Sequence, residues 1–338
     1  MVSVAKQVSN RIDLSRRPLS KMKKSLFVIA LLTMGLCYES HGAFGLPFSS
    51  SSSPNEASEP APQSTSLRAS NGARARMQGA RTGGTSAGGG WIDSKEPVAA
   101  PSSVVHTPYF EYSYINIDSD PANVAAPTNG GHEHVYALGY DLSWDSGLII
   151  GAAYEYAYRS LFAQQKLDTH TVSAYASAPV IGDLVASLIG GYSNGNFASL
   201  VAPGANFNGD SWFINPGVSH TWTCGNVIFN AGLSYLYTDT DTRLGGVTTN
   251  TDIGQIVAET GARVNLTDIL YVSAGLQYNG ITSHDFAPAA VDETWWRVNT
   301  EIGADLANGM TVYTGYARDF GHDFYDIDTV RLGLLYSY

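Results

Sequence analysis

Charged residues are scarce in this sequence. Only 14% of its 338 residues are Asp, Glu, Lys or Arg, and the formal net charge is −11. An acidic excess argues against a nucleic-acid partner. The overall hydropathy is near zero, which excludes a bundle of membrane helices. It does not exclude strands that alternate apolar and polar residues, because such strands average out.

Cysteine is nearly absent too. The sequence has only Cys37 and Cys224, and Cys37 falls in a segment that we expect to be removed from the mature chain. No intramolecular disulfide is therefore predicted. The sequence also has no phosphate-loop motif and no cysteine motif for a metal, so we expect no cofactor and no metal.

Few residues are arranged for enzymatic chemistry, which would need His, Ser and an acid grouped at one place. Ser219 and His220 form the only adjacent Ser–His pair inside a predicted strand, and neighbours in a strand point to opposite faces. His132 and His134 share a face near a loop and could contact a metal or an acid, but a loop histidine pair is usually only solvated. We expect no enzymatic activity.

Residues 1–43 are interpreted as a targeting segment. Lys23 and Lys24 precede an apolar stretch over 25–36, and small residues follow at 40–43. This order is typical of a secretory signal peptide; a short buried helix is the alternative. Either Met22 is the first residue translated, or residues 1–21 extend the basic region.

Residues 44–106 are rich in Ser, Pro, Gly and Ala and have few large apolar side chains. Such a segment cannot offset its ordering entropy, so a disordered linker or short passenger is predicted. Four arginines in it have no acid between them: Arg68, Arg74, Arg76 and Arg81. They fit either a solvated basic loop or a segment that lies in an acidic channel.

From residue 107 to the end, apolar and polar residues alternate with the period of a β-strand. Short turns of the Gly, Asn or Asp type interrupt the alternation, and each joins two antiparallel strands. The turns centre on Ser146, Gly182, Gly225, Thr267 and Asn308. Longer polar segments separate the hairpins, at 118–131, 159–168, 193–209, 238–252, 279–291 and 319–326. Counting 109–117 first and 330–338 last predicts twelve strands.

Aromatic residues on the apolar faces are sorted by strand end. Those beside the long segments are Tyr154, Tyr156, Tyr158, Tyr192, Tyr235, Tyr237, Tyr278, Tyr316, Trp212 and Trp296, and those beside the short turns are Trp144, Trp222, Tyr336 and Tyr338. Leu, Ile, Val and Ala fill the middles. Two aromatic belts around an aliphatic band are typical of the two interfaces of a membrane. The pattern predicts an all-β fold, a 12-stranded antiparallel transmembrane β-barrel over 107–338.

The opposite face of the strands would line the lumen. It carries a glycine on most strands and the charged residues Asp141, Glu155, Glu259, Arg263, Arg297, Glu301, Asp305 and Arg331. These charges would be costly in a packed soluble core but are ordinary in a polar lumen. A soluble propeller also repeats about every 40 residues, but its blades need four short strands per repeat where this sequence has two long ones.

The final strand carries a more specific pattern. Arg331, Gly333, Tyr336 and Tyr338 follow the order polar-x-Gly-x-x-aromatic-x-aromatic, which resembles the C-terminal assembly signal of bacterial outer-membrane β-barrels. With twelve strands, inner glycines and a flexible segment before the barrel, residues 107–338 resemble the translocator domain of autotransporters. The chain lacks the Asn-Asn pair of one self-cleavage pattern of that family.

The resemblance implies a bacterial outer-membrane location, contact with outer-membrane lipid, and insertion by the barrel-assembly machinery with the help of periplasmic chaperones. It also implies that the barrel exports or displays its own N-terminal segment, here only 44–106. The alternative is a small general porin that passes hydrophilic solutes. The sequence does not predict the oligomeric state or the cargo.

Overall fold

The computed structural model describes residues 61–81, 104–119, 131–161, 165–199, 207–244, 247–284, 294–306, 309–321 and 325–338. The predicted targeting segment 1–43 lies outside these residues. Among the described residues, no helix is long and apolar enough to cross a membrane.

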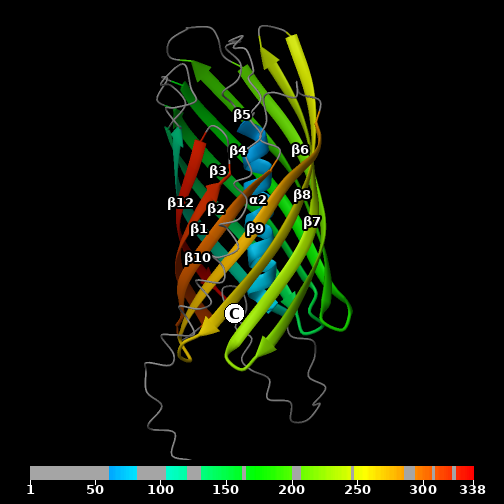
Figure 1. Cartoon of the computed structure of the whole chain (residues 1–338), viewed down its shortest axis with the longest axis vertical. Helices are drawn as coiled ribbons and strands as arrows, with labels where there is room; N and C mark the ends of the chain where they lie inside the picture. The colour runs from blue at the N-terminus through cyan, green and yellow to red at the C-terminus, as the bar shows by residue number, and fades with distance from the viewer. Residues whose placement is uncertain are drawn as a thin grey trace, which may run out of the picture. The chain divides into compact units, whose positions relative to one another are not determined.

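Twelve antiparallel strands form one closed barrel (Figure 1). Each strand pairs with its neighbours in the sequence, and β1 closes the ring by pairing with β12. The strands are β1 (Val104–Ser119), β2 (Gly131–Trp144), β3 (Ile149–Leu161), β4 (Gln165–Ile181), β5 (Leu184–Ser199), β6 (Phe207–Cys224), β7 (Val227–Leu244), β8 (Val247–Asn265), β9 (Leu270–His284), β10 (Thr294–Asp305), β11 (Met310–Phe320) and β12 (Tyr325–Tyr336). The predicted strand number and antiparallel barrel are confirmed.

Four of the five predicted turns lie between consecutive strands, at Ser146, Gly182, Gly225 and Thr267, and Asn308 is outside the described residues. Gly147, Gly182 and Gly225 have positive φ angles of 78°, 54° and 66°, which only glycine adopts without strain. We call this end of the barrel the turn end and the opposite end the loop end.

The strands extend further toward the loop end than the sequence pattern predicts. Most of 238–252, expected to be a loop, belongs to β7 and β8. Thr238 and Thr240 are buried on the inner face there, while the Asn250 amide donates to Asp239 and Asp241 on the outer face. Backbone pairing continues where both faces are polar, so hydrophobic alternation ends before the strand does.

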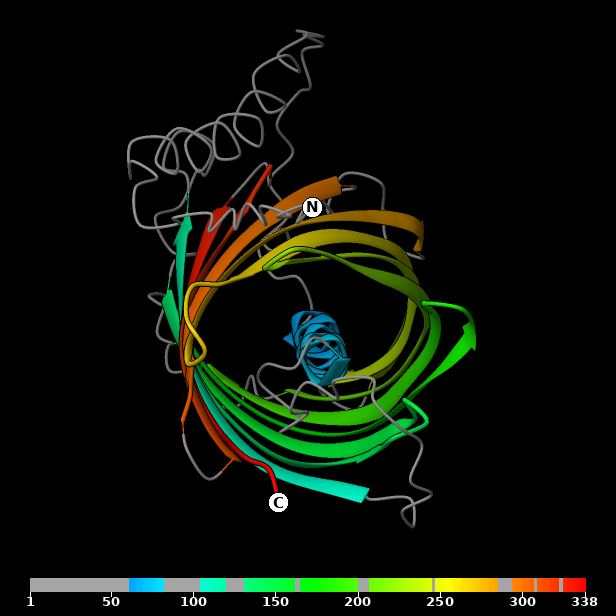
Figure 2. The same ribbon diagram turned by 90° about the horizontal axis from the view of Figure 1, so that it is seen from below.

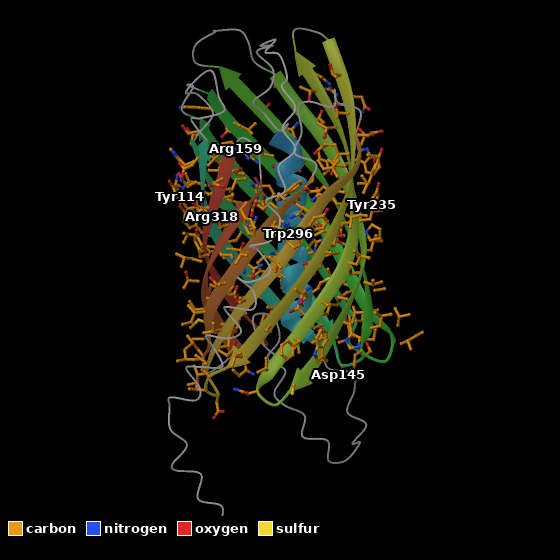
Figure 3. The ribbon with its side chains drawn as sticks, viewed as in Figure 1. Tyr114, Asp145, Arg159, Tyr235, Trp296 and Arg318 are labelled. Carbon is orange, nitrogen blue, oxygen red and sulfur yellow. The ribbon has the colours of Figure 1, made fainter. Side chains whose placement is uncertain are left out.

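Apolar side chains cover the outside of the barrel, the reverse of a soluble fold. Leu138, Val172, Leu233 and Leu332 are more than half exposed, and the barrel surface is therefore suited to hydrocarbon. Outer aromatics pair across strands near both ends, as in Tyr278–Trp296 (5.0 Å between ring centroids) and Trp222–Phe229 (5.6 Å). Tyr114 and Tyr235 lie on this outer surface on opposite sides of the barrel (Figure 3).

Inner glycines make room for side chains of the neighbouring strand. At five positions the direct cross-strand partner of the glycine is an inward aromatic ring that a Cβ would strike: Tyr109–Gly139, Tyr175–Gly151, Phe213–Gly191, Tyr271–Gly303 and Tyr313–Gly333. The rings occupy the space that a Cβ would take at each glycine, which lets large residues line the wall.

Residues Ala61–Arg81 form a helix, α2, that lies inside the barrel (Figure 2). This differs from the expected linker without regular structure over 44–106. β1 also begins at Val104, three residues before the predicted start of the barrel at 107. The helix buries Ser66, Ala69, Ser70 and Ala73 on one face. Because these residues are small, they form no hydrophobic stripe from which the sequence could have predicted the helix. Most of the stability of a helix in a protein comes from tertiary packing, so α2 depends on the wall against which it packs.

Candidate functional site

The candidate functional feature of this barrel is α2, which lies in the lumen. The helix contacts β3, β4, β5, β6 and β7 and lies off-centre, nearer to these strands than to β10 (Figure 2). On its other side the lumen holds a cavity of about 280 Å³.

The direction of α2 follows from its contacts. Arg68 contacts Glu133, which lies near the loop end of β2, whereas Gln78 bonds Asn230, which lies near the turn end of β7. The N-terminal end of the helix therefore points to the loop end, and its C-terminal end points to the turn end. β1 also starts at the turn end, where Val104 pairs with Trp144.

An apolar patch on the wall supports the helix. Ala69, Ala73 and Met77 pack on a cluster formed by Ile149, Tyr175, Ile189, Phe213 and Leu236. Ala73 and Ile189 have no exposed surface. Because Ala69 and Ala73 are small, the helix backbone approaches the wall closely there, and the contact excludes water from that side of the helix.

Arg68 connects α2 to two carboxylates at once. Its Nη2 lies 2.6 Å from Glu155 Oε1 and its Nη1 lies 3.0 Å from Glu133 Oε1. Glu133 also accepts from Arg159 of the wall at 3.1 Å. All of these side chains are largely buried, so the loss of one partner would leave an uncompensated charge.

Arg74 and Gln78 attach the middle and the C-terminal part of the helix. Arg74 Nε lies 3.6 Å from Glu259 Oε2, and Arg74 Nη1 donates to Asn215 at 3.2 Å. Gln78 donates to Glu259 and accepts from Asn230 at 3.0 Å. Glu259 therefore contacts two successive turns of α2.

Arg76 lies among aromatic rings. Its guanidinium carbon is 4.3 Å from the Tyr109 ring centroid, and its Nε donates to the Tyr175 hydroxyl at 3.2 Å. The Tyr175 hydroxyl in turn donates to Asp141. A cation held over a ring face and linked to a carboxylate is stabilised by both contacts.

The sequence left two interpretations of the arginines in 44–106, a solvated basic loop or a segment that lies in an acidic channel. For Arg68, Arg74 and Arg76 the structure supports the second. The guanidinium groups of all three bond residues of the barrel wall, whereas a solvated loop would leave them exposed. Arg81 ends α2, and its side chain is not among those described.

The lumen charges expected from the alternation lie as follows. Asp141, Glu155 and Arg263 are buried, and Glu259, Arg263, Arg297, Glu301 and Arg331 line the cavity. Asp305 lies 3.0 Å from Arg263, and Glu301 lies 2.9 Å from Arg331. Arg297 pairs with Asp319 at 3.2 Å.

Sequence reasoning missed four further lumen charges, Glu111, Glu133, Arg159 and Asp319, which all line the cavity. Glu133, Arg159 and Asp319 share the inner parity of their strands with residues already assigned to the lumen, and they lie within or beside segments interpreted as loops. Glu111 lies inside the predicted strand 109–117, from which no lumen residue was assigned. The same alternation, extended over the full length of every strand, finds all four.

The terminal pattern divides between the two faces. Arg331 and Gly333 face the lumen, where Gly333 lies against Tyr313, while Tyr336 and Tyr338 are exposed on the outside. Tyr338 exchanges two backbone hydrogen bonds of 3.0 Å with His106, and their rings stack. The last residues thus join the first strand.

The histidines considered for chemistry lie on the outer face. The His132 and His134 rings are 5.4 Å apart, and His134 bonds the Tyr112 hydroxyl at 2.8 Å. Among the described residues no group of three His, Cys, Asp or Glu side chains could hold a metal ion. His220 contacts Trp222 rather than Ser219.

No protein-family model and no curated protein sequence matches this chain. Solved structures do resemble it. The translocator domain of the autotransporter NalP from Neisseria meningitidis superposes with a TM-score of 0.55 at 14% identity, covering 82% of this chain and 98% of that one. The COG4313 outer membrane channel from Pseudomonas putida F1 gives a TM-score of 0.51 at 12% identity, covering 72% of this chain and 100% of that one. At these identities the likeness concerns the fold. The chain is a β-barrel of the outer-membrane type and resembles an autotransporter translocator domain.

Proposed function

We propose that this protein is an autotransporter-type translocator in the bacterial outer membrane, which has passed its own N-terminal segment through its barrel to the cell surface. The observation that carries the proposal is the direction of α2. Its N-terminal end points to the loop end, the end that faces the exterior in outer-membrane barrels. A chain that enters the periplasm from the inner membrane reaches this arrangement only if the residues before α2 cross the lumen.

The contacts of α2 also support a plug that stays after transport. Arg68, Arg74 and Arg76 are matched to wall groups, and Ala73 is fully buried against the wall. The helix would thus close most of the lumen and keep the preceding residues displayed outside.

An epitope tag inserted at residue 60 tests this proposal. Antibody should reach the tag on intact cells, because the tag follows the exported segment and directly precedes α2. The matched control is the same tag at residue 95, between α2 and β1, which should be reached only after the outer membrane is permeabilised. If the tag at 60 is reached only after permeabilisation, the segment was not exported.

A second candidate function is a channel for small hydrophilic solutes. The cavity of about 280 Å³ beside α2, lined by charged residues such as Glu301 and Arg331, favours it. A steady large conductance of the purified native barrel would support a channel, whereas a small conductance that rises when α2 is displaced supports the plugged translocator.

A further inference from the structure

The barrel wall alone does not balance the charges that face the lumen. In the described part of the wall, inward carboxylates outnumber inward arginines two to one. The carboxylates are Glu111, Glu133, Asp141, Glu155, Glu259, Glu301, Asp305 and Asp319, and the arginines are Arg159, Arg263, Arg297 and Arg331.

Each wall arginine is paired with a carboxylate of the wall. The four pairs are Arg159–Glu133 at 3.1 Å, Arg263–Asp305 at 3.0 Å, Arg297–Asp319 at 3.2 Å and Arg331–Glu301 at 2.9 Å. Three of them join residues of β8, β10, β11 and β12 to one another. The charges of these three pairs are balanced without the helix.

Asp141, Glu155 and Glu259, here called the helix-facing carboxylates, depend instead on α2. Arg68 lies 2.6 Å from Glu155, and Arg74 lies 3.6 Å from Glu259. Tyr175 links Arg76 to Asp141, because its hydroxyl accepts from Arg76 Nε at 3.2 Å and donates to the Asp141 carboxylate. Among the described residues, no wall arginine forms a salt bridge with these three. Glu111 belongs to neither group, because it accepts a hydrogen bond from the Tyr313 hydroxyl of the wall.

We propose that the helix-facing carboxylates are the selectivity determinant of this lumen and form a receptor for polycations, of which the three guanidiniums of α2 are the resident ligand. When those positive charges are removed, the wall is left with three uncompensated carboxylates, on β2, β3 and β8. Confined charges of one sign concentrate counter-ions and repel co-ions. The lumen should then pass potassium in preference to chloride and bind a polyamine.

The inference goes beyond the proposed export and does not require it, because it concerns only the charge balance of the folded barrel. The test uses the full chain, purified and placed in planar bilayers under a KCl gradient. Arg68→Gln, Arg74→Gln and Arg76→Gln together should raise the potassium-to-chloride permeability ratio about tenfold over the native chain at 0.1 M salt. Spermine should block the current of this variant. At 1 M salt, where the screening length is only about 3 Å, the preference should fall.

Two further variants locate the effect. Adding Asp141→Asn, Glu155→Gln and Glu259→Gln to the triple variant should return the permeability ratio to the native value and abolish the spermine block. Adding Arg297→Gln with Asp319→Asn removes one charge of each sign from the wall and should leave the ratio of the triple variant unchanged. The proposal is overturned if the triple arginine variant has the native potassium-to-chloride permeability ratio. It is also overturned if the added carboxylate substitutions and the added Arg297→Gln and Asp319→Asn reduce the selectivity equally.

If the triple arginine variant fails to assemble, a second variant tests the proposal. This variant carries Asp141→Asn, Glu155→Gln and Glu259→Gln in the otherwise native chain, which leaves the guanidiniums of α2 in excess. Its potassium-to-chloride permeability ratio should therefore drop below the native value. A ratio equal to that of the native chain would contradict the proposal.

Discussion

Single residues in this barrel are sorted by the face of the strand on which they lie. Neighbours along β9 illustrate this: Tyr271 is 1% exposed, Val272 is 36% exposed on the outside, and Ser273 lines the cavity. The same substitution should therefore change stability differently at a position that faces lipid and at the next position, which faces the lumen.

Val272→Arg should cost about 2–4 kcal/mol of folding free energy, because it places a charge on the apolar, lipid-facing side of the barrel wall. Ser273→Arg is the matched control and should be milder, since the lumen is polar. Denaturant titration of the barrel refolded in lipid vesicles measures both. Equal losses at the two positions would contradict the assignment of faces.

Gly303→Ala tests the space that inner glycines leave. A Cβ at residue 303 would strike the Tyr271 ring, which Arg263 covers at 3.6 Å and which donates to Glu301 at 2.9 Å, so the ring cannot move freely. We expect a loss of about 1–3 kcal/mol, as for an overpacked core. Gly190→Ala, where a Cβ meets its nearest atom at 3.6 Å, should change stability little in the same titration. Similar losses in both would show that general strand flexibility, not the ring, requires the glycine.

At the scale of elements, apolar packing holds α2 on one side and salt bridges hold it on another. Ala73 is fully buried on the patch around Ile189, while Ala75 is exposed beside the cavity. The apolar contact fixes how close the helix lies to the wall, and the arginines fix its position along the lumen.

Ala73→Leu should therefore displace α2, because the buried contact has no room for three more carbons and overpacking costs about 1–3 kcal/mol. Trypsin should cleave after Arg68, Arg74 or Arg76 faster in this variant than in the native barrel. Ala75→Leu adds the same side chain on the open side and should keep the native cleavage rate. The explanation fails if the two variants are cleaved at the same rate.

At the scale of the whole molecule, closure satisfies every strand edge. β1 pairs with β12 along eleven residue pairs, from Tyr109–Leu335 to Ser119–Tyr325, and the final residues add backbone bonds to His106 and Gly309. An open edge would leave backbone groups unpaired in hydrocarbon.

Removal of residues 336–338 should block assembly without blocking export to the periplasm. The change deletes the bonds to His106 and Gly309 and the outer aromatics of the proposed assembly signal. We expect the heat-modifiable band of the folded barrel to disappear from outer-membrane fractions and a degraded periplasmic species to accumulate. Tyr338→Phe, which keeps the ring and the backbone bonds, should assemble normally. Native amounts of folded barrel after the deletion would refute the role of these residues.

The sequence by itself determined the strands, their order and their faces. Alternation has a period of two, and each strand pairs with the next in the chain, so information local to a hairpin is enough. The same alternation assigned Asp141, Glu155 and Glu259 to the lumen. It failed at the loop end of β7 and β8, because polar residues on both faces hide a strand that backbone pairing continues.

Only the tertiary structure decided what fills the lumen. Residues 61–81 lack an apolar stripe of large side chains, so their helix forms against a wall that the rest of the chain must first build. The partners of Arg68 lie 65 and 87 residues away, and Gln78 bonds Glu259 across 181 residues. Local pattern carries no information about contacts at such distances. The pairing of a basic helix with carboxylates of β2, β3 and β8 is a property of the closed barrel, because only closure places these strands around one axis.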